Sequence, residues 1–335
     1  LITTLIMING LKAEQITILH INDHHSHLKP DKRMSLMLDG KSTRVQSGGM
    51  PAVVAKIKEL ESTSNNVIKL HAGDAISGSL FFTLFKGEAD AALMNEICFD
   101  AFVLGNHEFN EGDKGVAKFI DFLKSEKCST SVLAANIKPE VGVSALTPNS
   151  ETDYIQPYSI IEKGGMKVGI IGIDIVRKTI MSSSPDETTK FLDEAETSQK
   201  IVNELKKSGV KHIILLTHYG YENELELAAT IEGVDVIIGG DSHTLLGDFD
   251  KLGLNAAGPY PTIVKGVGGK LVCVATAWQY SQIVGEMTIS FNEDGEVQSC
   301  KGIPHLMLAD SFKRKNSEGD RVEIKGADRE AVYSQ

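Results

Sequence analysis

Short apolar runs alternate with segments of helical periodicity along most of the chain. The apolar runs are rich in Val, Ile and Leu, and they lie at 16–21, 67–70, 101–104, 132–135, 167–173, 212–216 and 234–238. Between them, apolar residues recur at helical spacing at 50–60, 88–97, 115–124, 194–207 and 222–231. Continuously apolar strands separated by amphipathic helices predict an α/β fold in which helices cover the sheets.

The pattern becomes β-rich after residue 261. We predict strands at 262–267, 271–276 and 283–291, separated by Gly268-Gly269 and by a turn at 292–295. After His305 the chain is charged and weakly patterned, which is typical of a linker or a terminal helix. The sequence has no internal repeat, no Walker loop and no GxGxxG motif between a strand and a helix.

The first residues resemble the end of a secretory signal. Residues 1–8 are apolar, and Ala13 stands at a plausible cleavage position. We interpret residues 1–14 as a signal-peptide remnant; an ordinary strand or a tag is the alternative. The run is too short to span a bilayer, and no later run reaches that length. We therefore expect an exported protein, periplasmic or on the cell surface, with no membrane span.

The net charge of −11 narrows the choice of partners. Binding to duplex nucleic acid depends on Lys and Arg contacts to phosphate, so an acidic protein argues against that partner. An acidic protein that acts on anionic phosphates needs local positive charge, and bound cations are one source of it.

Four cysteines occur, at positions 98, 128, 273 and 300, and none forms a CxxC pair. A thiolate zinc site is therefore disfavoured. In an oxidising compartment the four allow three disulfide patterns. We favour Cys98–Cys128 with Cys273–Cys300 because each pair is close in sequence, and four buried free thiols are an equal alternative.

Polar clusters follow five of the predicted strands directly. They contain, in chain order, Asp23 and His25, then Asp74, then Asn106 and His107, then His218, and finally Asp241 and His243. Ligands of open α/β sheets gather outside the carboxyl ends of the strands, so these side chains are expected to converge on one crevice. Each cluster alone is a weak signal, because Asn106 suits a turn and Asp241 suits a helix N-cap. Five clusters that each follow a predicted strand are together a strong signal of a shared site.

The residue types favour a transition-metal site. Oxygen and imidazole ligands suit Zn, Mn and similar ions better than Ca. Asp23 and His25 lie on the same side of an extended segment and can reach one ion. Asp74 can bridge two ions through its two oxygens, and Gly73 and Gly105 allow the backbone to approach closely.

The same motifs resemble a known family. They are Asn22-Asp23-His24-His25, Gly73-Asp74, Gly105-Asn106-His107-Glu108, Thr217-His218 and Gly239-Gly240-x-Ser242-His243. This series resembles the calcineurin-like metallophosphoesterases, and more narrowly the N-terminal catalytic domain of the 5′-nucleotidase family, with its NAD-nucleotidase and periplasmic UDP-sugar hydrolase members. The resemblance implies a four-layer α/β/β/α sandwich with a catalytic domain at 15–305. It also implies that 306–335 is a linker toward a C-terminal nucleotide-binding domain.

The resemblance implies a role for each residue of the clusters. One ion would be held by Asp23, His25, Asp74 and His243, and a second ion by Asp74, Asn106, His218 and Asp241. His107 would be the catalytic histidine beside the scissile phosphate. Two such ions would act on both the attacking and the leaving oxygen of the displacement.

Two positions depart from the family pattern. The family commonly has His where this chain has Asp241, so an added anion would lower the positive charge of the second metal site; replacement of this ligand by water is the alternative. Many members have Asp three residues after the catalytic His, where this chain has Asn110. We expect Asn110 to accept a hydrogen bond from His107 without adding charge, which leaves His107 less basic.

These observations predict an enzyme, a two-metal phosphoric ester hydrolase. Its expected substrates are nucleotide 5′-phosphates and the pyrophosphate of dinucleotides such as NAD or of UDP-sugars. The motif GNHEFN, which includes Asn110, also suits a 2′,3′-cyclic nucleotide phosphodiesterase/3′-nucleotidase. An alternative of another class is a non-catalytic exported protein that binds metal or nucleotide.

Overall fold

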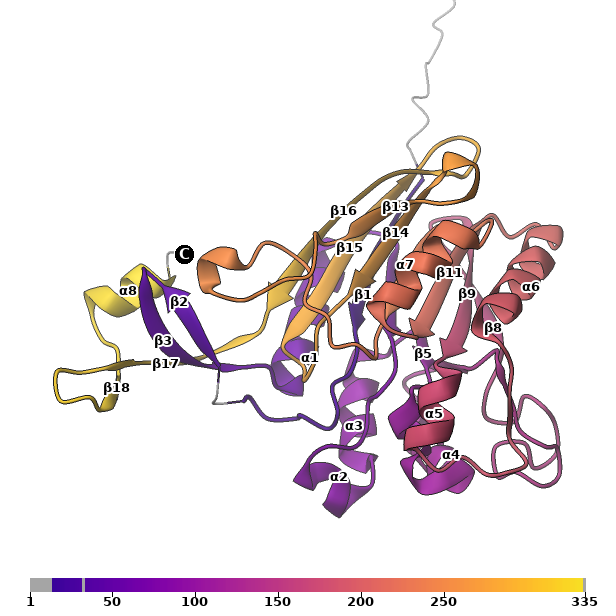
Figure 1. Ribbon diagram of the computed structural model, residues 1–335, viewed down its shortest axis with the longest axis horizontal. Coiled ribbons are helices and arrows are strands. Elements are labelled where there is room, and N and C mark those ends of the chain that lie inside the picture. Colours follow the sequence, from indigo (N-terminus) through magenta and orange to yellow (C-terminus); the bar gives the residue numbers. More distant parts are fainter. Residues whose placement is uncertain (1–13, 32–33, 334–335) are drawn as a thin grey trace, which may run out of the picture.

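The computed structural model describes residues 14–31 and 34–333, so nearly all of the proposed signal remnant lies outside the described residues. Two six-stranded sheets form the body of the molecule (Figure 1). The first sheet has the order β16-β15-β1-β4-β5-β6, and its strands are β1 (Gln15–Ile21), β4 (Val67–His71), β5 (Ala101–Val103), β6 (Ser131–Leu133), β15 (Ile283–Phe291) and β16 (Val297–Leu306). Strands β1, β4, β5 and β6 are parallel, so their carboxyl ends share one edge.

The second sheet has the order β13-β14-β12-β11-β9-β8. Its strands are β8 (Tyr158–Lys163), β9 (Met166–Asp174), β11 (His212–His218), β12 (Val236–Gly239), β13 (Thr262–Lys265) and β14 (Leu271–Thr276). Strands β9, β11, β12 and β14 are parallel, and β8 and β13 are antiparallel edge strands.

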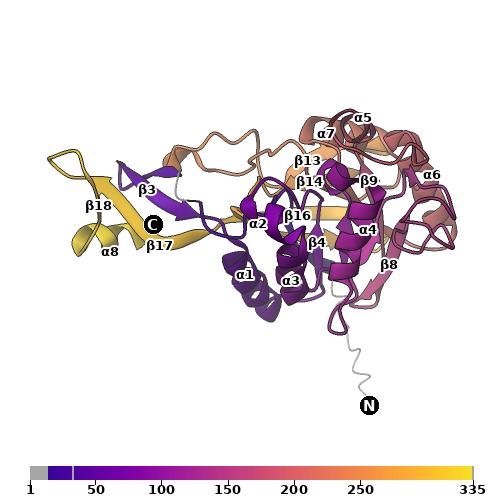
Figure 2. The ribbon, with the colours of Figure 1, turned by 90° about the horizontal axis from the view of Figure 1, so that it is seen from below.

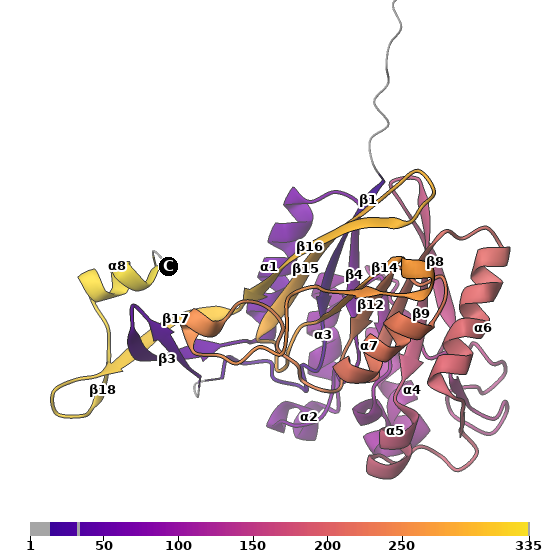
Figure 3. The same ribbon diagram turned by 45° about the horizontal axis from the view of Figure 1, so that its top comes forward.

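Helices cover the outer faces of the two sheets. The helices beside the first sheet are α1 (Met50–Thr63), α3 (Glu88–Ile97) and α4 (Gly112–Leu123), and those beside the second are α6 (Glu194–Lys207) and α7 (Tyr221–Thr230). Figure 3 shows α1 and α3 on one flank of the sheets and α6 on the other. Strand β1 shows why the layers form: Ile16 and Ile18 join the cluster that holds residues of both sheets, whereas Leu19 and Ile21 pack with Met50 of α1. The four-layer α/β/β/α sandwich is confirmed.

Both disulfides pair as expected. Cys98 bonds to Cys128, with a Cα–Cα distance of 5.2 Å, and Cys273 bonds to Cys300, with a Cα–Cα distance of 6.3 Å. The second bond joins β14 to β16 and therefore ties the two sheets together. The cysteines are 30 and 27 residues apart, and closing loops of this length restricts the unfolded chain by about 3–4 kcal/mol each.

A small third sheet extends to one side of the body (Figure 2). It consists of β2 (Ser35–Leu38), β3 (Lys41–Ser47), β17 (Leu308–Lys315) and β18 (Arg321–Glu323), with α8 (Ala327–Tyr333) after it. Leu36, Val45 and Phe312 form its own apolar core. Charged residues that alternate with buried ones along β17 hide this strand in the sequence, where we expected a linker or helix. The domain boundary at 305 stays a prediction.

The remaining elements are short. They are β7 (Ile137–Lys138), β10 (Lys190–Phe191), α2 (Leu80–Phe85), α5 (Val176–Ser182) and 3₁₀ turns at Asn106–Glu111, Asp250–Leu252 and Val267–Gly269. Among the described residues, no helix is both long and apolar enough to cross a bilayer.

Candidate metal centre

The polar clusters at the five strand ends meet where the two sheets face each other. Backbone hydrogen bonds join the segments after β1 and β4: Asp23 N donates to Gly73 O at 3.0 Å, and His25 N donates to Asp74 O at 3.1 Å. A further bond crosses from one sheet to the other, because Asp241 N donates to Asp23 Oδ2 at 3.0 Å. The expected convergence of the strand ends is therefore present.

One group of candidate ligands consists of Asp23, His25 and His243. His25 Nε2 lies 3.0 Å from His243 Nε2 and 3.6 Å from Asp23 Oδ1, and His243 Nε2 lies 3.2 Å from the same carboxylate oxygen. An ion with ligand bonds of about 2.0–2.2 Å places neighbouring ligand atoms roughly 3.0–3.5 Å apart. The spacing of these three atoms fits a shared divalent ion.

A second group adjoins the first and consists of Asp23, Asp74 and His218. His218 Nε2 lies 3.1 Å from Asp74 Oδ2 and 3.7 Å from Asp241 Oδ1. The other nitrogen of this ring, Nδ1, is 2.8 Å from Ala72 O, so it donates to that carbonyl, which orients the ring and directs Nε2 toward the carboxylates.

Several buried polar atoms at this place have no hydrogen-bond partner within the described residues. They are Asp23 Oδ1, His218 Nε2 and both amide atoms of Asn106. A buried polar group without a partner costs about 1–3 kcal/mol, so such groups rarely gather without a ligand. Carboxylate, imidazole and amide oxygen together are a donor set for divalent transition metals. The residues present therefore fit the ions that the sequence predicted.

Backbone strain is concentrated at the same residues. Asp23, His25, Asp74, Asp241 and His243 have φ of 47°, 45°, 53°, 76° and 50°. Left-handed φ is uncommon for residues other than glycine and costs of order 1–3 kcal/mol at each position. Five of the seven proposed ligands share this conformation, which persists only where the surrounding structure enforces it.

Close packing behind the ligands requires glycine. A Cβ atom on Gly73 would come within 2.6 Å of His218 Nδ1, and one on Gly105 would collide with Asp74 Oδ1. Glu108 supports the same segments, because its carboxylate accepts from the backbone N–H groups of Gly105, Asp74, Ala75 and Ile76. Burial and the neighbouring Asp74 charge raise the pKa of Glu108 to about 8, against the effect of these bonds.

The charges at the centre support one another. Burial alone would raise the pKa of Asp23, but His218, His243 and His25 hold it well below its usual range. Burial would also raise the pKa of Asp74, but the neighbouring His218 lowers it below its usual value. The pKa of His218 is raised well above its usual value because Asp74 and Asp23 outweigh its burial. These contacts favour the charged forms of the two carboxylates and of His218.

His107 lies beside the ligands, as expected, and Asn110 contacts its ring. His107 N donates to Asp74 Oδ1 at 2.8 Å. Asn110 Nδ2 lies 2.9 Å from both His107 Nδ1 and Ser77 Oγ, and Ser183 Oγ donates to Asn110 Oδ1 at 3.3 Å. The contact between Asn110 and His107 Nδ1 is present, and the tautomer of the ring decides which of the two donates, so our expectation that Asn110 accepts from His107 stays a prediction. The pKa of His107 is lowered, mainly by burial.

Lys178 was missed by the sequence reasoning. It lies on α5, and its Nζ donates to Asp241 Oδ1 at 2.5 Å. Burial alone would lower its pKa, but Asp241 raises it. The residue follows β9, whose end Asp174 is paired in register with His218 of β11. Only the order of the strands reveals that the segment after β9 reaches the same edge.

A sequence profile of the family described as "Calcineurin-like phosphoesterase" matches residues 16–245, which include every proposed ligand. The chain belongs to the calcineurin-like phosphoesterase family. The family implies divalent metal ions, and the Asp and His groups described above are able to bind them.

Relatives of this chain are nucleotidases by name. It is 42% identical to an "NAD 5′-nucleotidase" of Haemophilus influenzae over 95% of this chain and 51% of the relative, and 40% identical to a "Probable 5′-nucleotidase" of Treponema pallidum over 95% and 52%. The solved structure of the Haemophilus influenzae NAD nucleotidase matches with a TM-score of 0.89 and 41% identity, over 96% of this chain and 62% of that one. The chain spans about half the length of these curated relatives.

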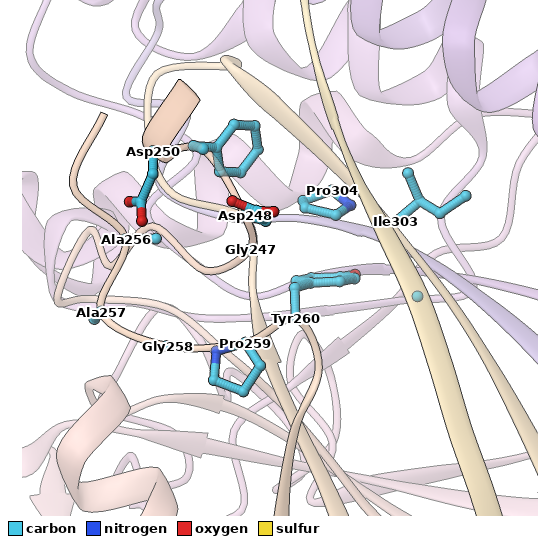
Figure 4. Close-up of a pocket in the computed structure, with 12 residues that line it drawn as sticks. Gly247, Asp248, Asp250, Ala256, Ala257, Gly258, Pro259, Tyr260, Ile303 and Pro304 are labelled. Atoms are coloured by element: carbon cyan, nitrogen blue, oxygen red, sulfur yellow. The ribbon is translucent and has the colours of Figure 1, made fainter. Parts of the chain in front are cut away.

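The hollow at the candidate metal centre has a volume of about 370 Å³. We call it the metal pocket; its lining residues include Asp74, His107, Lys178, Asp241 and His243. A larger hollow of about 720 Å³ lies elsewhere on the chain, between the 247–260 segment and β16 (Figure 4). Its lining combines glycines, alanines and prolines with Asp248, Asp250, Phe249, Tyr260 and Ile303, and it shares no residue with the metal pocket. Volume alone therefore does not locate the chemistry.

Proposed function

We propose that this protein is a two-metal phosphoesterase that hydrolyses nucleotide 5′-phosphates and the pyrophosphate of NAD or UDP-sugars. The observation that carries the proposal is the pair of adjoining ligand groups with His107 beside them in one pocket. The names of the relatives support the substrate class, since they are 5′-nucleotidases and an NAD nucleotidase.

We assign Asp23, His25, Asp74 and His243 to one ion, and Asp74, Asn106, His218 and Asp241 to the other. Zinc, manganese or a similar ion suits these ligands. Bound there, the ions would polarise the phosphoryl group and lower the pKa of a water nucleophile toward about 7.

The protein's own residues would act on the phosphate and hold the catalytic histidine in place. His107 lines the pocket without belonging to the assigned ligands, so it is placed to stabilise charge on the phosphoryl oxygens or to protonate the leaving oxygen. Asp74 fixes the backbone beneath this ring through its bond with His107 N. Asn110 fixes the ring itself, because Ser77 and Ser183 hold its amide from both sides.

Asn110→Asp tests whether a protonated His107 takes part. With Asn110, the pKa of His107 is lowered, so activity that needs the imidazolium falls as pH rises through a low pKa. A carboxylate at this position accepts from Nδ1 and stabilises the imidazolium, so we expect the falling limb of the pH–rate profile to move to higher pH by about 1 unit. Profiles of both proteins in the same metal buffer measure this, and an unmoved limb would contradict the role.

The chain's relatives are about twice its length, and we propose that a C-terminal domain supplies most of the nucleoside pocket. We further propose that the protein is exported, because a structure similar to this chain is described as a precursor and the first residues resemble a signal.

Turnover of p-nitrophenyl phosphate, AMP, NAD and 2′,3′-cyclic AMP tests the function. We expect this chain, loaded with zinc or manganese, to hydrolyse p-nitrophenyl phosphate weakly and without selectivity. With the C-terminal domain attached, AMP and NAD should be preferred over 2′,3′-cyclic AMP. Hydrolysis of 2′,3′-cyclic AMP alone would favour the cyclic phosphodiesterase, which Asn110 in GNHEFN also suits. Bound metal without turnover of any substrate would indicate a binding protein, against which the presence of His107 argues.

A further inference from the structure

Lys178 lines the metal pocket, and neither the proposed metal ligands nor the proposed catalytic residues include it. Among the described residues, the lining of the metal pocket includes no other lysine and no arginine. Its side chain is 42% exposed, whereas Asp241 is 11% exposed, so the ammonium group stands on the open side of the carboxylate. Helix α5, which carries it, begins directly beyond the carboxyl ends of β9 and β11 (Figure 1).

The contact with Asp241 orients Lys178 but does not use all of its hydrogen-bonding capacity. Nζ donates to Asp241 Oδ1 at 2.5 Å. An ammonium group has three donors, and the bond to Asp241 occupies one of them. Because the side chain lines the same hollow as Asp74 and His107, the remaining donors can reach an anion in that hollow.

The negative charge of the carboxylates around the pocket favours a cation at the position of Lys178. Three carboxylates, those of Asp23, Asp74 and Asp241, lie within reach of His218 Nε2 at 3.9, 3.1 and 3.7 Å. Together these carboxylates bring negative charge close to the place that an anionic substrate would occupy. These negative carboxylates repel an anionic phosphate, and one fixed cation beside Asp241 offsets that repulsion.

We propose that Lys178 is a phosphate-binding residue of the metal pocket, held in place by Asp241. It contacts a non-bridging oxygen of the substrate phosphate through the donors that Asp241 leaves open. This inference rests on the proposed function, because it assigns the phosphate to the same pocket. It adds a protein-borne cation to the positive charge that the ions supply.

Binding of inorganic phosphate to the metal-loaded protein tests the proposal directly. We expect Lys178→Met to weaken phosphate binding about 10-fold by calorimetry, since a hydrogen bond to a charged group contributes about that much. Metal content should stay at the wild-type level. Lys178→Arg should retain most of the affinity, because it keeps a cation in the same place.

Arg177→Met is the matched control. Arg177 precedes Lys178 on α5, is exposed and does not line the pocket, so removing its charge should leave phosphate binding unchanged. Where turnover is measurable, Lys178→Met should raise KM and leave kcat nearly unchanged, as expected for a contact made equally in the ground state and the transition state.

Two results would overturn the inference: unchanged phosphate affinity in Lys178→Met with normal metal content, or loss of metal from that variant, which would make Lys178 a support of the metal ligands instead. Failure of the proposed function is a separate result. If the wild-type protein binds metal and phosphate but hydrolyses no nucleotide, the phosphate titration still decides the role of Lys178.

Discussion

Replacing Asp74 with Asn is expected to remove the bound metal and the activity together. Asp74 is 1% exposed, its Oδ2 lies 3.1 Å from His218 Nε2 and 3.7 Å from His25 Nε2, and it therefore touches both ligand groups. Asn keeps the shape and can still accept the bond from His107 N, but it loses the negative charge that two cations need. Bound ions contribute several kcal/mol to the transition state, so activity should fall by at least about 10³-fold.

Metal content and thermal unfolding measure this effect independently of turnover. A ligand at 100 times its dissociation constant stabilises the folded state by about 2.7 kcal/mol, so zinc or manganese should raise the melting temperature of the wild type and not that of Asp74→Asn. Asp294→Asn, at an exposed position in the turn between β15 and β16, is the matched control and should behave as the wild type. An Asp74→Asn protein with normal metal content and rate would refute the assignment of Asp74.

The centre was predictable because its residues follow strands that the sequence marks clearly. Strand β1 reads as a largely apolar run shortly before Asp23, and β11 reads the same way before His218, so the carboxyl ends of the sheets could be located without coordinates. Apolar periodicity also gave α3 and α6 with their observed bounds, Glu88–Ile97 and Glu194–Lys207.

Residues that depend on the order of the strands could not be predicted. Lys178 reaches the centre because β9 lies next to β11 in the second sheet, and the local sequence does not indicate which strands are neighbours. The orientation of Asn110 depends on Ser77 and Ser183, which come from segments far away in the chain. Strand β17 was missed for another reason, because its exposed Lys313 and Lys315 mask the buried Phe312.

Replacing His107 with Ala is expected to slow hydrolysis by about 10²–10⁴-fold while both ions stay bound. The substitution deletes the imidazole that lines the pocket and keeps the backbone N–H that Asp74 accepts, so the ligand geometry has no cause to change. Single-turnover rates and metal content of the same preparation give the two quantities. A rate loss at constant metal content separates a residue that acts on the phosphate from one that holds an ion.

This distinction matters because the ring nitrogens of His107 also lie near a ligand group. One nitrogen falls within 4.8 Å of ligand atoms of His25 and Asp74, so the rival role is that of a fourth ion-binding histidine. Loss of metal in His107→Ala would support that rival and contradict the catalytic role. His305→Ala is the matched control, because His305 Nε2 bonds to Glu286 at 2.8 Å outside the metal pocket. Its removal deletes an imidazole of the same kind and should leave the rate and the metal content unchanged.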